Sequence, residues 1–151
     1  MYKNNINYLY FSLMILYSLI YISNKSRECS ESDINAILTS SYKNNKKNQV
    51  TGILLEYKNH FLQYLEGDPI SIYELFEKIK SDTRHDSIFL AKFDKIEERK
   101  FKSWEMAYRN LENPDEIRLM SKTEMPIKLE EILNKQEFWK TIEVIEFMSN
   151  V

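Results

Sequence analysis

The residue with the most distinctive chemistry is Gln63, an amide placed within an otherwise apolar stretch at residues 61–65. Alternate side chains of a β-strand share a face, so Gln63 is predicted to lie beside Phe61. A buried amide offers four hydrogen-bonding positions, and leaving one of them unpaired costs about 1–3 kcal/mol. We therefore expect a polar partner opposite this face, and Tyr21 and Asn45 are the candidates.

Each group of this kind also has a purely structural interpretation. Gln63 could be an ordinary core glutamine whose amide is satisfied by backbone groups or buried water. Trp104 and Met106 alternate on one face of a further expected strand, where an aromatic ring and a thioether commonly serve core packing. Four polar residues lie at the C-terminal end of an expected helix, where cations interact favourably with the helix dipole with or without a ligand. These residues are Lys78, Asp82, Arg84 and His85.

Several classes of function lack the residues that they need. Cys29 is the only cysteine, and the two histidines, His60 and His85, are too far apart in the sequence for a metal-ligand motif. Two glycines, Gly52 and Gly67, cannot build a glycine-rich phosphate loop. The chain shows no Ser/His/Asp arrangement, so an enzyme such as a small hydrolase is not indicated. The formal net charge of -2 gives no basic field for nucleic acid.

The elements that must position these residues follow from the hydrophobic pattern. Strands are predicted at residues 15–23, 50–57, 61–66, 87–93 and 101–108. Helices are predicted at residues 31–42, after a capping signal at Ser30 and Asp33, and from the Asp68-Pro69 pair onward. Residues 43–48 are polar and break the periodicity, so we expect a loop there. The order β-α-β-β-α-β with an added strand favours a ferredoxin-like α+β sandwich.

The 151 residues are expected to form one domain with two flanking segments. Residues 1–13 are predicted to be an N-terminal extension, residues 14–110 the domain, and residues 111–151 a C-terminal helical segment. A short helix is expected after Asn113-Pro114, and a later amphipathic helix is expected to cover the second face of the sheet. The apolar face of that helix is formed by Phe138, Ile142, Ile145 and Met148.

The uncharged run at residues 6–22 is short and diluted by polar side chains, which argues against a membrane helix. A membrane-tethered protein is nevertheless an alternative, and fractionation would distinguish it. A single cysteine allows no internal disulfide bond, which suits a cytoplasmic protein.

With these residues in view, the chain resembles the BLUF domain, the blue-light sensor that uses FAD. The resemblance covers roughly residues 16–108, about two-thirds of the chain. It rests on five motifs in the order of the family: Leu19-Ile20-Tyr21-Ile22-Ser23, Asn45 with Thr51-Gly52, Phe61-Leu62-Gln63-Tyr64-Leu65-Glu66-Gly67, Asp82-Thr83-Arg84-His85, and Glu98-Arg99-Lys100-Phe101-Lys102-Ser103-Trp104-Glu105-Met106.

The resemblance implies a flavin between the two helices, over the sheet face that bears Tyr21 and Gln63. Asn45 would hydrogen-bond the imide edge of the flavin, and Asn44 stands where some members carry His. FAD is the expected cofactor, with FMN as the alternative. The further cofactor contacts that the resemblance implies are Ile37, Ser41, Phe61, Lys78, Asp82, Arg84 and His85.

The resemblance also implies a photoreceptor rather than an enzyme. Light-driven, proton-coupled electron transfer from Tyr21 to the flavin would rearrange the hydrogen bonds of Gln63, and Trp104 and Met106 would relay the signal outward. The segment after Tyr108 is too short for a cyclase or phosphodiesterase domain, so we expect a homo-oligomer that signals to a separate partner protein. The alternative is a light-inert interaction module that keeps the ferredoxin-like fold without flavin.

Overall fold

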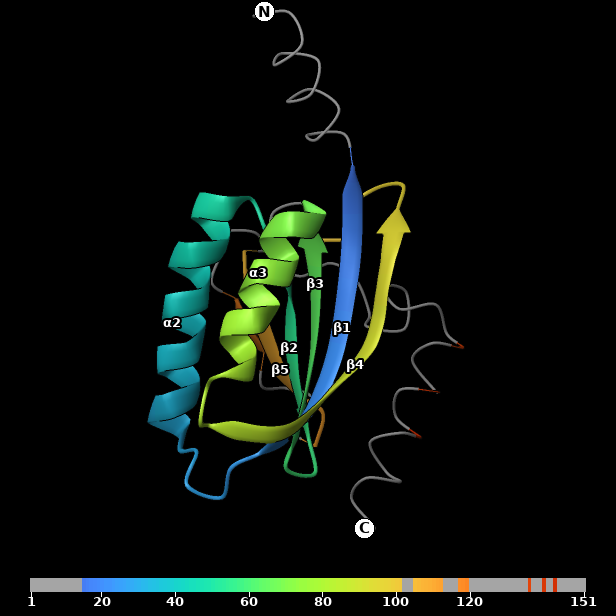
Figure 1. Ribbon diagram of the computed structural model, residues 1–151. Helices are drawn as coiled ribbons and strands as arrows, with labels where there is room; N and C mark the ends of the chain where they lie inside the picture. Colours follow the sequence, from blue (N-terminus) through green and yellow to red (C-terminus); the bar gives the residue numbers. More distant parts are fainter. Residues whose placement is uncertain are drawn as a thin grey trace, which may run out of the picture.

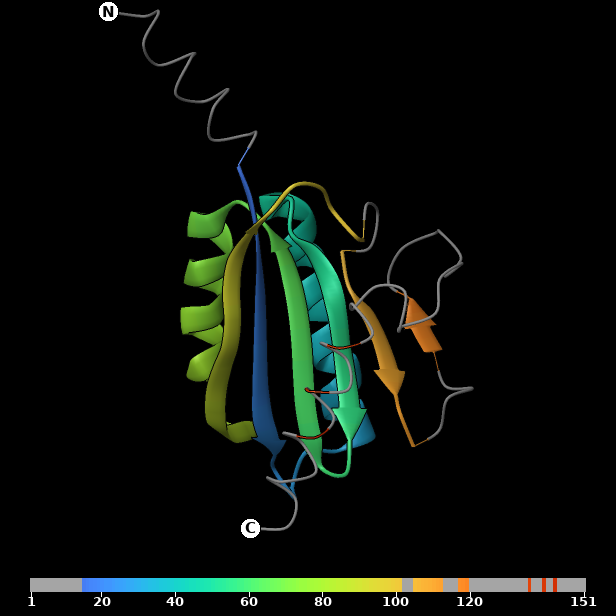
Figure 2. The same ribbon diagram turned by 90° about the vertical axis from the view of Figure 1, so that its right-hand side faces the viewer.

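The computed structural model describes residues 15–101, 105–112 and 117–119, together with Gln136, Lys140 and Glu143. In this part of the chain six strands form one sheet in the order β4-β1-β3-β2-β5-β6 (Figures 1 and 2). Neighbouring strands are antiparallel, except that β2 and β5 are parallel. The strands are β1 (Leu16–Lys25), β2 (Thr51–Tyr57), β3 (His60–Gly67), β4 (His85–Ile96), β5 (Ala107–Asn110) and β6 (Ile117–Leu119).

Two helices, α2 (Glu31–Asn48) and α3 (Pro69–Lys80), lie on the same face of the sheet and run in opposite directions (Figure 1). The capping signals predicted from the sequence are present at both starts. Ser30 and Asp33 form a reciprocal capping box before α2, and the Asp68 side chain accepts a hydrogen bond from the Ser71 N–H at the start of α3. The predicted ferredoxin-like α+β arrangement is confirmed.

Helix α2 is longer than the sequence pattern predicts. The prediction of a loop at residues 43–48 is wrong, because the helix continues to Asn48. It is capped by Gln49, whose backbone is in the left-handed conformation. The last turns carry polar side chains and so show no apolar periodicity. Within these turns Asn45 alone is buried, at 1% exposure, and its burial comes from tertiary contact. The basic residues Lys43, Lys46 and Lys47 therefore lie on a helix and not in a loop.

The edge of the sheet also differs from the prediction. The strand expected at residues 101–108 is shorter and later, since β5 spans Ala107–Asn110. Beyond it, residues 117–119 form β6, where the sequence predicted a short helix after Pro114. The physical reason is the open edge of β5, whose backbone groups pair with β6 in antiparallel register from Ala107 to Arg109. The predicted apolar face at residues 138–148 lies outside the described residues, while Gln136, Lys140 and Glu143 are helical and exposed.

Both faces of the sheet are buried, which explains why β1 is apolar on both sides. On the helix side the core includes Leu19, Leu38 and Leu65, and on the opposite side it includes Ile20 and Ile22. The C-terminal helix that is expected to cover the second face of the sheet lies outside the described residues. Among the residues that the structure describes, no helix combines the length and the apolar character that crossing a bilayer requires.

Candidate functional site

Tyr21 and Gln63 form a buried hydrogen bond at the centre of the sheet. They are directly opposite each other in the β1–β3 pair, so both side chains point to the face covered by the helices. The Tyr21 hydroxyl donates to Gln63 Oε1 at 2.6 Å. Tyr21 is 3% exposed and Gln63 is 4% exposed, so this bond is shielded from water. The polar partner expected for Gln63 is therefore Tyr21.

The other half of the Gln63 amide faces β5. Gln63 Nε2 lies 3.9 Å from Met106 Sδ, a weak acceptor, and Met106 is fully buried. The amide thus has a strong partner at its oxygen and a weak one at its nitrogen. Trp104, the other residue expected on this strand, lies outside the described residues.

The phenol of Tyr21 is held in its neutral form. Burial raises the pKa of Tyr21 far above its ordinary value, and the negative charge of Asp82 raises it further. The Tyr21 ring also contacts Phe76 of α3, with centroids 5.7 Å apart, and meets the His85 ring at 6.0 Å with the planes at 64°. Tyr21 is therefore a hydrogen-bond donor across the whole physiological pH range.

Asn45 connects helix α2 to the segment before β5. Its Nδ2 group donates to the Glu105 carbonyl oxygen at 2.6 Å. Its Oδ1 atom is buried and has no hydrogen-bond partner among the residues that the structure describes. Because an unpaired buried acceptor is costly, this atom marks a position that suits a donor from a bound molecule.

His85 is fixed by two hydrogen bonds that determine its tautomer. Nε2 lies 2.6 Å from the Ile79 carbonyl oxygen, which can only accept, so Nε2 carries the proton. Nδ1 is then the acceptor for the Ser23 hydroxyl at 2.7 Å. These contacts join α3, β4 and β1 beside Tyr21.

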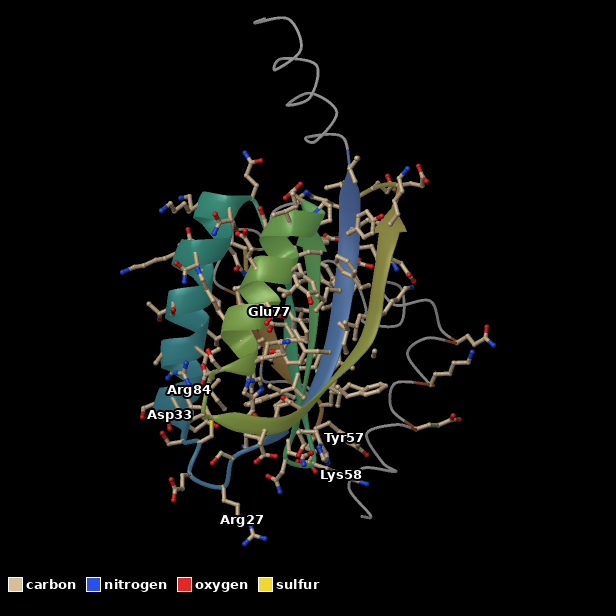
Figure 3. The ribbon with its side chains drawn as sticks, in the orientation of Figure 1. Arg27, Asp33, Tyr57, Lys58, Glu77 and Arg84 are labelled. Carbon is tan, nitrogen blue, oxygen red and sulfur yellow. The ribbon has the colours of Figure 1, made fainter. Side chains whose placement is uncertain are left out.

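Asp82 and Arg84 form an ion pair between α3 and β4, with Arg84 Nη2 2.6 Å from Asp82 Oδ2. The hydrogen bonds from Arg84 lower the pKa of Asp82, so the carboxylate is charged at neutral pH. Arg84 lies near Asp33, at the first turn of α2 (Figure 3). This end of the helix layer therefore combines a guanidinium with two carboxylates.

These residues line one cleft between the helices and the sheet, which has a cavity volume of about 160 Å³ and is partly open to solvent. Every cofactor contact expected from the sequence lies on its wall, as do Tyr21 and Gln63, whereas Met106 lies behind Gln63. The cofactor contacts are Ile37, Ser41, Asn44, Asn45, Phe61, Lys78, Asp82, Arg84 and His85.

Sequence reasoning missed four residues of the cleft wall, namely Ser40, Leu54, Leu75 and Ile79. Leu54 is the strand partner of Gln63, which only the β2–β3 register reveals. The other three had a detectable signal. Ser40 precedes Asn44 by one helical turn, Leu75 precedes Lys78 by three residues, and Ile79 follows Leu75 by four, so that each lies on a helix face already identified.

Comparisons with known proteins agree with this geometry. The photoactivated adenylate cyclase subunit beta of Euglena gracilis is 32% identical over 88 residues, which cover 58% of this chain and 10% of that protein. The chain thus spans about a tenth of the length of the curated relatives that it matches.

Two solved structures share the fold. BlrB, a BLUF protein in its dark state, is 33% identical, with a TM-score of 0.63 over 66% of this chain and 76% of that chain. BlrP1 of Klebsiella pneumoniae, with FMN and cyclic diGMP, is 27% identical, with a TM-score of 0.65 over 83% of this chain and 33% of that one.

The sequence model of one family, described as sensors of blue light using FAD, matches residues 16–107. This span runs from the start of β1 to the start of β5, and it includes the Tyr21–Gln63 pair and the cleft that surrounds it. With its fold, its cleft and this match in agreement, the chain belongs to the BLUF family.

Proposed function

We propose that this protein is a blue-light photoreceptor in which a bound flavin and the Tyr21–Gln63 pair form the switch. The observation that carries the proposal is the buried hydrogen bond from the Tyr21 hydroxyl to Gln63 Oε1 on the wall of the cleft between the helices and the sheet. A purely structural glutamine would need no such cleft beside it.

The residues present fit a flavin. The Oδ1 atom of Asn45, which has no partner among the described residues, suits an imide N–H, a group that can only donate. Ile37 and Phe61 offer apolar contact for a planar ring. At the other end of the cleft, Lys78 supplies a positive charge of the kind that phosphate groups require, whereas the charge of Arg84 is paired with Asp82. FAD is the proposed cofactor, and FMN shares the same ring and would use the same contacts.

When bound, the flavin supplies a light-activated oxidant that can accept an electron from Tyr21. Loss of an electron makes the phenol strongly acidic, so its proton moves along the existing hydrogen bond to Gln63 Oε1. Gln63 is suited to this step because one amide both donates and accepts, which neither Glu nor Leu reproduces. After the electron and proton return to Tyr21, the amide remains in a new hydrogen-bonding arrangement.

The structure of the pocket favours a limited, reversible change. Two hydrogen bonds at about 0.5–1.5 kcal/mol each can bias a conformational equilibrium by about 1–3 kcal/mol. That range corresponds to about 5- to 150-fold, which is typical of allosteric coupling. Because Gln63 Nε2 contacts Met106, reorientation of the amide would change the contact with the segment that enters β5.

The output proposed for this signal is a change in self-association or in binding to a separate protein. BLUF relatives named above include cyclase subunits, so sensor domains of this kind accompany effectors. Met106 and the neighbouring Glu105 connect the cleft to the edge of the sheet, which supports this edge as the output side.

The test is the absorption spectrum of the flavin-loaded protein before and after blue illumination. The wild type is expected to show a reversible red shift of the flavin bands. Tyr21→Phe and Gln63→Leu are expected to retain flavin and lose the shift. Tyr42→Phe and Gln136→Leu, which make the same changes outside the cleft, are the matched controls and should shift normally.

Failure of the wild type to bind flavin would instead support the light-inert module. A normal red shift in Tyr21→Phe or Gln63→Leu would contradict the proposed switch while leaving flavin binding intact.

A further inference from the structure

Glu66 is a fully buried carboxylate on the sheet face opposite the cleft, at 0% exposure. Its Oε1 atom accepts from the Thr51 hydroxyl at 3.1 Å and from the Phe101 N–H at 2.5 Å. Its Oε2 atom accepts from the Tyr64 hydroxyl at 3.0 Å and from the Lys100 N–H at 2.9 Å. Four donors around one carboxylate compensate for its burial, so this is a specific arrangement and not an accidental contact.

Arg99 adds further hydrogen bonds beside the Glu66 carboxylate. Its guanidinium donates to the Thr51 hydroxyl at 3.0 Å, to the Glu66 carbonyl at 3.2 Å and to the Gln49 carbonyl at 2.6 Å. Three consecutive residues, from Arg99 to Phe101, are therefore fixed to the ends of β2 and β3. In a chain segment without regular secondary structure, such contacts determine where the backbone runs.

The segment fixed by Glu66 leads directly to the switch. Five residues after Phe101, Met106 Sδ lies at the Gln63 amide, and the preceding Glu105 carbonyl accepts from Asn45. Glu105 follows Phe101 by only four residues in the sequence, so both contacts lie close along the chain to the anchored backbone. Glu66 itself lies three residues after Gln63 on β3 but points to the other face, so it touches neither Tyr21 nor the cleft.

We propose that Glu66 is a positioning residue of the light switch. Its carboxylate anchors the Lys100 and Phe101 backbone, and that anchor places Glu105 and Met106 against Asn45 and Gln63. This inference rests on the proposed function, because it assigns Glu66 a part in the same switch.

Substitution with glutamine separates this role from simple packing. Gln has the same size as Glu, but one oxygen becomes an NH₂ group that can only donate. The hydroxyls of Thr51 and Tyr64 can rotate to become acceptors, whereas the two backbone N–H groups cannot. In either orientation the amide of Glu66→Gln would face one backbone N–H, so one end of the anchor is lost.

Glu66→Gln is expected to keep the folded circular dichroism spectrum and to bind FAD. The rate at which the lit state returns to the dark state is expected to change by about 5-fold or more. In flavin-free protein, hydrogen exchange at Glu105–Ala107 is expected to accelerate, while exchange in β1 and at the centre of β3 stays unchanged. Glu74→Gln, the same change on the exposed side of α3, is the matched control.

Wild-type protein that shows no red shift would refute the proposed function. A normal wild-type red shift, with Glu66→Gln identical to wild type in recovery rate and in exchange at Glu105–Ala107, would refute the role of Glu66.

If Glu66→Gln does not fold, the wild type still provides a test. The Lys100 and Phe101 amides are expected to be strongly protected from exchange in both dark and light. Rapid exchange at these two amides in the dark would overturn the proposal.

Discussion

At the scale of single residues, the switch depends on the register of two strands. Tyr21 and Gln63 meet because they are direct partners in the β1–β3 pair, and a slip of one residue would turn one of the two side chains to the other face. Burial keeps the phenol neutral by raising the pKa of Tyr21, so its hydroxyl always has a proton to donate. The pair therefore already holds the hydrogen bond that the proposed proton transfer requires.

Asn45 is the residue whose removal should affect cofactor affinity most specifically. Asn45→Ala removes the unpaired Oδ1 acceptor, and we expect FAD to bind about 5- to 150-fold more weakly, since one buried hydrogen bond is worth about 1–3 kcal/mol. Titration followed by flavin fluorescence measures the change. Asn48→Ala, on the exposed side of the same helix, should bind normally. Equal affinities for Asn45→Ala and wild type would remove Asn45 from the site.

His60 should make stability depend on pH between about 7 and 5. Burial lowers the pKa of His60, and the hydrogen bond with the Ser23 backbone opposes this less strongly. Below the ordinary histidine pKa near 6.5, the unfolded chain binds a proton that the folded chain resists. Stability is therefore expected to fall as the pH falls. His60→Gln should show a smaller loss in urea unfolding, and equal losses in both proteins would contradict this.

At the scale of elements, the β2–β3 pair requires glycine at position 52. A Cβ atom there would lie 2.0 Å from the Tyr64 carbonyl oxygen, which is a backbone atom of the neighbouring strand. Gly52→Ala is expected to lower the free energy of unfolding by about 3 kcal/mol or more, as measured by urea denaturation. Gly67→Ala, whose nearest atoms are 3.3–3.5 Å away, should cost much less. Comparable losses in the two variants would show that the strands separate readily.

The sequence predicted the elements that carry the site better than it predicted their ends. The capping residues Ser30 and Asp68 marked both helix starts correctly, because a cap is a local interaction. The end of α2 was wrong, because Asn45 is buried by tertiary contact that no local pattern records. Strand β6 was missed for the same reason, since its pairing with β5 is not local.

The cleft was predictable where its residues carry distinctive chemistry. Tyr21, Gln63 and Asn45 are polar residues in apolar or motif-bearing stretches, so they stand out in the sequence. Leu54 does not, because an apolar residue in a buried strand gives no sign of whether it faces a ligand or a neighbour. Glu66 was quoted within a motif, but its four donors come from three separate parts of the chain and emerge only in the folded structure.

At the scale of the whole molecule, the two faces of the sheet carry different features. The helix-covered face holds the cleft, and on the opposite face the Glu66 carboxylate accepts hydrogen bonds from the Lys100 and Phe101 N–H groups. Gln63 contacts Met106 just before β5, and β6 is the edge strand next to β5. A change at Gln63 that moves Met106 would therefore act close to the edge of the sheet. A partner protein or a second copy at this edge would sense the change directly.

Light should therefore alter the assembly of the protein. We expect the elution volume of the FAD-loaded wild type, or the set of proteins that it retains, to differ between dark and blue-lit samples. Gln63→Leu should behave as the dark wild type under both conditions, because its amide cannot reorient. Identical elution and identical binding in dark and light would place the output elsewhere.

The central claim is that light rearranges the hydrogen bonds of the Gln63 amide. The sequence contains three glutamines, Gln49, Gln63 and Gln136, so isotope-labelled glutamine gives an almost specific infrared probe. In the light-minus-dark infrared spectrum of FAD-loaded protein, we predict a shifted glutamine amide band that is present in the wild type and absent in Gln63→Leu. A wild type whose visible bands shift to the red without any change in a glutamine band would contradict the account.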